Sequence, residues 1–239
     1  MEKDNPARRL LNVLKKVNTI STNENTKRGW FKLFEIKNQD DEATLFRQLG
    51  KLMTLPNIVL DDVKKYHPSH EKVCIRTITV INNAFRKQDL NGQWKSFSQA
   101  IREETINYLE LISTLLDYEY KMNLLEEDKL LDIRKSVDDL IKDVTNSSLD
   151  KEFKIIIIKY LKKIIDSIDE YNIMGIEPIF EALEVTAGHA ILNKEFGQKL
   201  NESKLTKKFI FIFEKLISLV NSGNSLFQLA SNVSNILTK

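Results

Sequence analysis

The sequence predicts an all-α fold, an irregular multi-helix assembly of about ten helices with no significant sheet. Glycine and proline are scarce, with 7 and 4 residues in a chain of 239, whereas sandwiches and barrels need a turn every few residues. Apolar residues recur at three- and four-residue spacing along most of the chain, as they do on one face of a helix. With 42% hydrophobic residues, the chain can bury a core of this kind.

The first helix is expected to begin at Pro6, because proline suits the first helical turn. It should end at the polar stretch 19–27. A short helical turn then places Trp30, Leu33 and Phe34 on one face, which predicts that this face docks on the core.

A strongly amphipathic helix follows and is predicted to stop at Leu55, because Pro56 disfavours the α conformation in the residue before it. A brief helix over residues 57–66 comes next. Residues 70–88 alternate in part like a strand, but their length without glycine or proline favours a helix. Residues 96–99 match a capping box, so another helix is predicted to open there.

In the second half, a solvated amphipathic helix is predicted within residues 117–146, and the neutral polar stretch 145–148 is the clearest linker. We therefore expect an N-terminal helical subdomain of residues 1–146 and a C-terminal one of residues 147–239. The same pattern also fits a single domain with a break at that point. Ser148 is predicted to cap the helix that follows.

That helix is apolar around much of its circumference between Ile155 and Ile168, so we expect it to lie centrally. Further helices are predicted from Pro178, over residues 206–219, and after the break at Gly223.

The composition bounds the compartment and the partners. A formal net charge of +2 is too small to make nucleic acid the main partner. The single cysteine, Cys74, excludes an intramolecular disulfide and fits a reducing compartment. No apolar run precedes Leu10, so no signal peptide is visible and we expect a cytoplasmic protein.

No catalytic or cofactor motif stands out. His67, His70 and Cys74 form the only metal-like cluster, but zinc takes about four ligands, usually in paired spacings, and the sequence holds no second pair. The cluster is better explained as a proline-terminated turn beside a buried cysteine. The chain also has no nucleophile elbow, Walker loop or dinucleotide fingerprint. We therefore predict a protein that is not an enzyme and has no cofactor and no metal site.

The basic N-terminal region is a secondary candidate site. Residues 1–37 hold nine Lys and Arg against four Asp and Glu. Within them Lys27, Arg28, Trp30 and Lys32 combine cations with an aromatic ring, which suits nucleic-acid backbones or anionic lipid. The simpler interpretation, which we favour, is a helix that docks Trp30 on the core and keeps its lysines in water.

The most unusual segment is the C-terminal run from Leu216 to Thr238, which contains no Asp, Glu, Lys, Arg or His. Eleven of its residues are apolar and eleven are polar, whereas a transmembrane helix needs about twenty predominantly apolar residues. Three interpretations of this run therefore remain. The run is buried in the protein's own core, it faces a partner because interface cores are depleted of charge, or it inserts into a membrane as a hairpin with residues 209–220.

From these features we expect a non-catalytic cytoplasmic α-helical protein of the protein-interaction or regulatory class. It would act through the charge-free C-terminal helical surface on another protein or on a second copy of itself. The alternatives are a membrane-perturbing effector that uses the C-terminal helices, and a nucleic-acid-associated component that uses the basic N-terminus. The residues expected to form the interaction surface are Phe227, Gln228, Leu229, Asn232, Val233 and Ile236.

Overall fold

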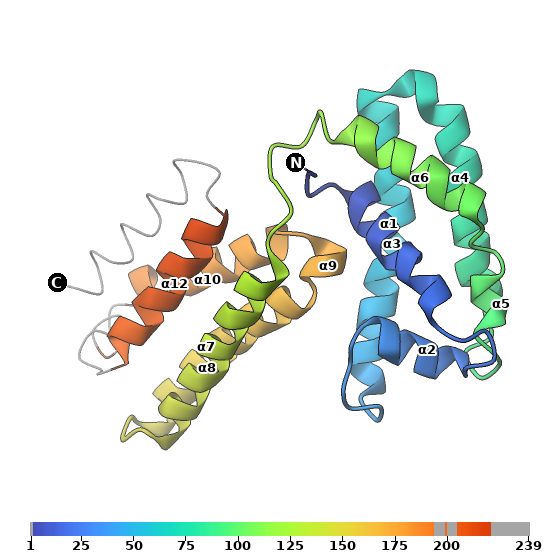
Figure 1. Cartoon of the computed structure of the whole chain (residues 1–239). Helices are drawn as coiled ribbons and strands as arrows, with labels where there is room; N and C mark the ends of the chain where they lie inside the picture. The colour runs from blue at the N-terminus through green and yellow to red at the C-terminus, as the bar shows by residue number, and fades with distance from the viewer. Residues whose placement is uncertain (1, 194–198, 200–204, 221–239) are drawn as a thin grey trace. The chain divides into compact units, whose positions relative to one another are not determined.

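The computed structural model describes residues 2–193, 199 and 205–220 (Figure 1). Over these residues the chain forms eleven α-helices and two short 3₁₀ helices, with no strand, which confirms the all-α prediction. The helix predicted after Gly223 lies outside the described residues. The α-helices are α1 (Pro6–Lys16), α2 (Thr26–Leu33), α3 (Glu42–Tyr66), α4 (Glu71–Lys87), α5 (Lys95–Ser98), α6 (Glu103–Leu116), α7 (Glu127–Asn146), α8 (Lys151–Asp169), α9 (Tyr171–Met174), α10 (Glu177–Leu192) and α12 (Thr206–Val220).

The chain divides into two compact units. Unit 1 contains Met1–Asn123 together with Asn172–Gly175, and unit 2 contains Leu124–Tyr171 and Ile176–Lys239. The boundary predicted between residues 146 and 147 falls at the turn between α7 and α8, which pack on each other within unit 2. A short neutral polar stretch has the same composition whether it forms a tight turn between two packed helices or a linker between two domains. Composition alone therefore did not distinguish a turn from a linker here.

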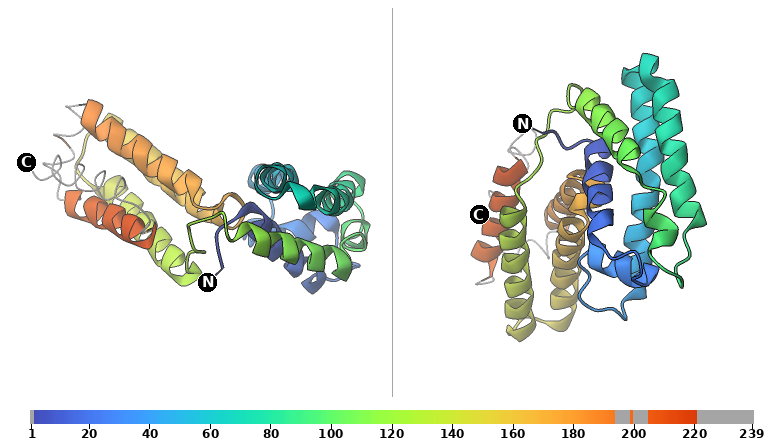
Figure 2. Two further views of the ribbon diagram at one scale, coloured as in Figure 1. Left: turned by 90° about the horizontal axis from the view of Figure 1, so that it is seen from above. Right: turned by 45° about the vertical axis from the view of Figure 1, so that its right-hand side comes forward.

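The longer helices of unit 1 are α1, α3, α4 and α6 (Figure 2). Helix α1 packs on α3 and α6, and α4 packs on α3 and α6. The Asn5 side chain caps α1 by accepting a hydrogen bond from the Arg8 amide, while Pro6 occupies the first turn as predicted. The apolar faces of these helices meet in one core cluster, whose fully buried members include Leu10, Leu14, Leu45, Leu52, Ile81 and Leu109.

Helix α3 corrects the prediction that the chain would break at Leu55 and Pro56, because it runs unbroken for 25 residues from Glu42 to Tyr66. Proline inside a helix removes one backbone hydrogen bond and crowds the preceding turn, at a cost of about 3 kcal/mol. Buried apolar residues on both sides of Pro56, including Leu52 and Val59, offset this cost by packing in the core. The helix predicted over residues 70–88 is confirmed as α4.

A cluster of aromatic rings fills the end of unit 1 near α2 and α5. Trp30 lies 5.0 Å from Trp94 and 4.8 Å from Phe97 between ring centroids, and both tryptophans are fully buried. Backbone hydrogen bonds hold the segments around them together, from Trp94 to Glu24 (2.7 Å) and from Thr26 to Gly92 (3.0 Å). Gly29 is required here, because a Cβ at this position would lie 2.5 Å from the Trp94 ring.

The predicted capping box at residues 96–99 is wrong, since Ser96 lies inside the short helix α5 and α6 begins only at Glu103. The Ser96 hydroxyl instead accepts a hydrogen bond from the Asp89 amide at 3.1 Å. The Ser96 side chain therefore bonds to a preceding loop, whereas the sequence pattern predicted that it would cap a helix.

The second segment of unit 1, residues 172–175, docks through both side chain and backbone. Ile173 is buried and belongs to the core cluster of unit 1. The Arg9 side chain donates to the Ile173 carbonyl at 3.1 Å and pairs with Asp4 at 2.5 Å. Gly175 has φ of 72°, and a Cβ there would collide with the Arg9 guanidinium, so glycine is needed on both grounds.

In unit 2, helix α8 packs against α7 and α10, and α12 packs along α7. The central position predicted for α8 agrees with this arrangement, although Ile155 remains exposed to solvent. The predicted N-cap Ser148 is wrong by two residues, because the Asp150 carboxylate accepts from the Phe153 amide at 2.9 Å. The helix predicted over residues 206–219 is confirmed as α12.

Candidate functional site

The charge-free C-terminal run begins in the last turns of α12, and its first residues are docked in unit 2. Leu216 and Ile217 are buried and continue the apolar face that starts with Phe209. The Phe209 and Phe213 rings stack at 4.8 Å between centroids. Leu216 and Ile217 are therefore core, as one of the three sequence interpretations requires, whereas Ser218 is exposed and Leu219 is half-buried.

Two ion pairs fix α12 on α7 in an antiparallel arrangement. Lys208 Nζ lies 2.6 Å from Asp143 Oδ2, and Lys215 Nζ lies 2.7 Å from Asp132 Oδ2. The hydrogen bond from Lys215 lowers the pKa of the Asp132 carboxyl. Exposed pairs of this kind add little stability by themselves, so the buried apolar face of α12 accounts for most of its docking on unit 2.

The outer side of α12 carries an exposed aromatic ring. Phe211 is 52% exposed, and Lys215 Nζ lies 4.8 Å from the centre of its ring. Phe211 precedes the start of the charge-free run by only five residues, since the run begins at Leu216. Unit 2 also exposes Val185 and Leu192 on α10. An exposed aromatic ring with a neighbouring cation is a common component of protein-binding surfaces.

The six residues predicted to form the interaction surface are not covered by the structural description. Phe227, Gln228, Leu229, Asn232, Val233 and Ile236 all lie outside the described residues. Their role therefore stays a prediction. The structure adds the contacts that dock α12, the helix before them, on α7.

The basic and aromatic segment of α2 does not form one surface. The Trp30 ring is buried and its Nε1 donates to Gln88 Oε1 at 2.7 Å, so this ring cannot stack on a base. Lys27 pairs with Glu42 at 2.7 Å, and Lys32 pairs with Glu24. Arg28 points into solvent. This arrangement agrees with the simpler interpretation, a helix docked through its tryptophan.

The His67 and His70 rings lie 6.3 Å apart between centroids, but Cys74 does not complete a group of three ligands with them. Cys74 is fully buried, and burial raises the pKa of its thiol to about 11. The His70 ring instead contacts the neighbouring Ser69 hydroxyl at 3.1 Å, and His67 Nε2 lies 3.6 Å from Glu119 Oε1. Across the described part of the chain, no three His, Cys, Asp or Glu side chains are grouped so that they could hold a metal ion.

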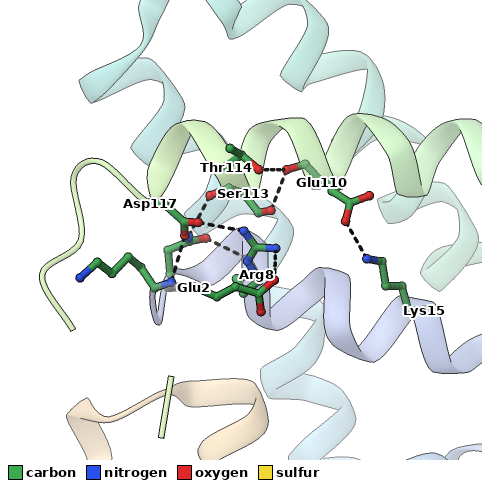
Figure 3. A network of polar contacts seen from close by, with 9 residues as sticks. Glu2, Arg8, Lys15, Glu110, Ser113, Thr114 and Asp117 are labelled. Atoms are coloured by element: carbon green, nitrogen blue, oxygen red, sulfur yellow. Dashed lines mark hydrogen bonds and ion pairs between the residues drawn. The ribbon is translucent and has the colours of Figure 1, made fainter. Parts of the chain in front are cut away.

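A buried polar network joins the start of α1 to the end of α6, and the sequence did not predict it (Figure 3). Asp117 accepts hydrogen bonds from the Asn5 amide group at 2.7 Å and from the Arg8 guanidinium at 2.9 Å. Arg8 also pairs with Glu2 at 3.0 Å, and the Asn5 amide reaches the Ser113 carbonyl. The Asn5, Arg8 and Asp117 side chains thus hold the two helices together, which makes the network structural, although Arg8 Nε is buried with no hydrogen-bond partner among the described residues.

Comparisons with known proteins give no assignment. No protein-family model matches the chain, and no curated protein and no solved structure is significantly similar to it. Within the described ranges, no helix combines the length and the apolar character that crossing a membrane requires. A function has to be argued from the residues themselves.

Proposed function

We propose that this chain is a non-catalytic binding protein whose charge-free C-terminal run contacts another protein or a second copy of the chain. One observation carries the proposal. The run begins inside α12, a helix that is fixed to α7 by a buried apolar face and by the Lys208–Asp143 and Lys215–Asp132 pairs. The run therefore starts from a defined point on unit 2.

The composition of the run favours a surface that loses its water on binding. Asn, Ser and Gln side chains are cheaper to desolvate than charged ones, and the cores of protein interfaces are depleted of charge. Each fully buried Leu, Ile, Val or Phe side chain contributes about 1.5–3 kcal/mol. Phe227, Leu229, Val233 and Ile236 together could therefore stabilise a specific contact.

The exposed ring of Phe211 extends this surface onto α12. Aromatic residues are enriched among the few side chains that dominate binding energy. Phe211 is held beside Lys215, which is itself paired with Asp132, so the ring sits on an ordered part of unit 2. We expect it to lie at the edge of the contact, where the lysine keeps access to water.

The experiment is a truncation that removes residues 223–239, compared with the full chain by size-exclusion chromatography with light scattering and by affinity capture. The truncated protein should keep its helical circular dichroism spectrum and lose its oligomeric state or its captured partner. A point variant, Leu229→Asp, should reproduce this loss by placing one charge in the run. Leu131→Asp is the matched control, because it adds the same charge at an exposed apolar position of α7.

Two outcomes contradict the proposal. Wholesale unfolding of the truncated protein would show that the run is core and nothing more. An unchanged mass together with unchanged capture, in both the truncation and Leu229→Asp, would remove the run from any interface.

A further inference from the structure

Unit 1 has a surface cleft beside the end of α2 that the sequence did not indicate. Its volume is about 330 Å³, which falls in the range of small-molecule sites. Ile20 and Leu33 contribute apolar surface, and Lys16, Lys32 and Glu35 bring charged groups to it. The cleft is thus partly apolar and carries two cations and one anion.

Glu35 holds an unusual backbone conformation at this cleft. Its φ is 57°, and it is the only non-glycine residue with a positive φ in the described part of the chain. The Glu35 amide donates to the Lys32 carbonyl at 3.1 Å and the Ile36 amide to the Phe31 carbonyl at 3.0 Å, which is the Schellman pattern that ends a helix. Glycine is the usual residue at this position because an L-residue is strained there.

The two lysines differ in how tightly their ammonium groups are bound by neighbouring carboxylates. Lys16 Nζ lies 3.6 Å from Glu35 Oε1, beyond hydrogen-bond distance, and about half of its side chain is exposed. Lys32 is hydrogen-bonded to Glu24, which lowers the pKa of the Glu24 carboxyl. Glu35 is therefore a loose counter-ion that an incoming anion can replace, whereas Glu24 keeps Lys32 in place.

We infer that this cleft binds a small organic anion. The anionic group would take the place of the Glu35 carboxylate beside Lys16 and would also face Lys32, while the apolar body of the ligand would lie on Ile20 and Leu33. Glu35 then acts as an internal competitor that occupies the cationic side of the cleft when no ligand is bound. All of these residues belong to unit 1, so the inference is independent of the function proposed for the C-terminal run.

The probe is phenyl phosphate, which has an anionic group on an apolar ring, titrated into the full-length protein by isothermal calorimetry. Inorganic phosphate tests the charge alone, and benzyl alcohol tests the ring alone. We expect saturable binding of phenyl phosphate with Kd of about 1 mM or tighter, weaker binding of phosphate, and none of benzyl alcohol. Binding of phosphate as tight as that of phenyl phosphate would remove the apolar part of the inference.

Variants at the cleft assign the binding to its residues. Lys16→Met and Lys32→Met should each weaken phenyl phosphate about tenfold or more, because each removes a charge-assisted contact. Glu35→Gln should strengthen binding severalfold by removing the internal competitor. Lys15→Met is the matched control, since Lys15 is also on α1 but pairs with Glu110 on α6 at 2.8 Å.

Tryptophan fluorescence checks that each variant is folded, because both tryptophans of the chain are buried in unit 1. Absence of saturable binding to the folded parent protein would overturn the inference. Equal weakening by Lys15→Met and Lys16→Met would also overturn it, because that result would show general attraction to a basic surface.

Discussion

Replacing Asp117 with alanine should destabilise unit 1 far more than breaking an exposed ion pair on the same two helices. Asp117 accepts from the Lys3 amide at 3.2 Å, from Asn5 at 2.7 Å and from Arg8 at 2.9 Å. The side chains of Arg8 and Asp117 are only 6% and 21% exposed, so water cannot fully replace the carboxylate. The alanine variant leaves the Arg8 guanidinium with only Glu2 as its charged partner.

The magnitude follows from the groups that lose their acceptor. An unsatisfied buried donor costs about 1–3 kcal/mol, more when it is charged, and breaking a buried ion pair costs about 3–5 kcal/mol. Asp117 retains some contact with solvent and Arg8 keeps Glu2, so we expect about 2–4 kcal/mol for Asp117→Ala. Asp117→Asn should cost less, because an amide oxygen in the place of Oδ1 still accepts from the Lys3 amide and from Asn5, and only the hydrogen bond from Arg8 to Oδ2 is lost.

The assay is urea denaturation followed by tryptophan fluorescence, which reports on unit 1 alone because Trp30 and Trp94 both lie there. The control is Glu110→Gln, which removes the partner of Lys15 on the same pair of helices, where both side chains are about half exposed. Its midpoint should stay close to that of the parent. If the urea midpoint of Asp117→Ala were as close to the parent midpoint as the Glu110→Gln midpoint is, the network would not stabilise unit 1 and the prediction would be wrong.

Two further predictions use glycine and cysteine. Gly29→Ala should destabilise unit 1 by about 1–3 kcal/mol, because the added Cβ would lie 2.5 Å from the Trp94 ring. Gly50→Ala should stabilise α3, because nothing lies within 4 Å of a Cβ at that position. Equal urea midpoints for the two variants would contradict this prediction. Burial raises the pKa of the Cys74 thiol to about 11, so only about 0.1% is thiolate at pH 8, and iodoacetamide should label it rapidly only in denaturant. Rapid labelling of the folded protein would contradict this prediction, because it would show that the thiol is accessible. The free energy of unfolding should also depend on pH: the stability that the protonated thiol contributes is present below pH 9 and is lost as the pH rises towards 11.

The periodic parts of the sequence predicted helices well, and the local stop signals were less reliable. Apolar spacing identified α1, α4 and α12 because each buries one continuous face. Pro56 did not stop α3, since packing on both sides of it outweighed the lost hydrogen bond. Ser96 and Ser148 looked like caps, but one contacts a preceding loop and the other gives way to Asp150 two residues later.

The functional candidates depend on information that a single sequence does not contain. The Asn5–Asp117 contact joins residues 112 positions apart, and no local pattern marks either partner for the other. The positive φ of Glu35 is equally invisible, because glutamate is common on solvated surfaces and no glycine stands at this position to mark the end of α2. The charge-free C-terminal run and the helix that anchors it were both visible in the sequence, and the ion pairs between that helix and α7 came from the structure.

The discontinuity of unit 1 sets an order of events during synthesis. Residues 172–175 are translated only after the whole of residues 124–171, on the order of several seconds after Asn123 at the usual rate of elongation. Small helical domains fold faster than this. We therefore expect the first 123 residues to begin folding without Ile173, whose core contacts, and whose carbonyl as acceptor for Arg9, come only when the nascent chain supplies them. A chaperone that binds apolar surface on nascent chains would meet unit 1 in that interval.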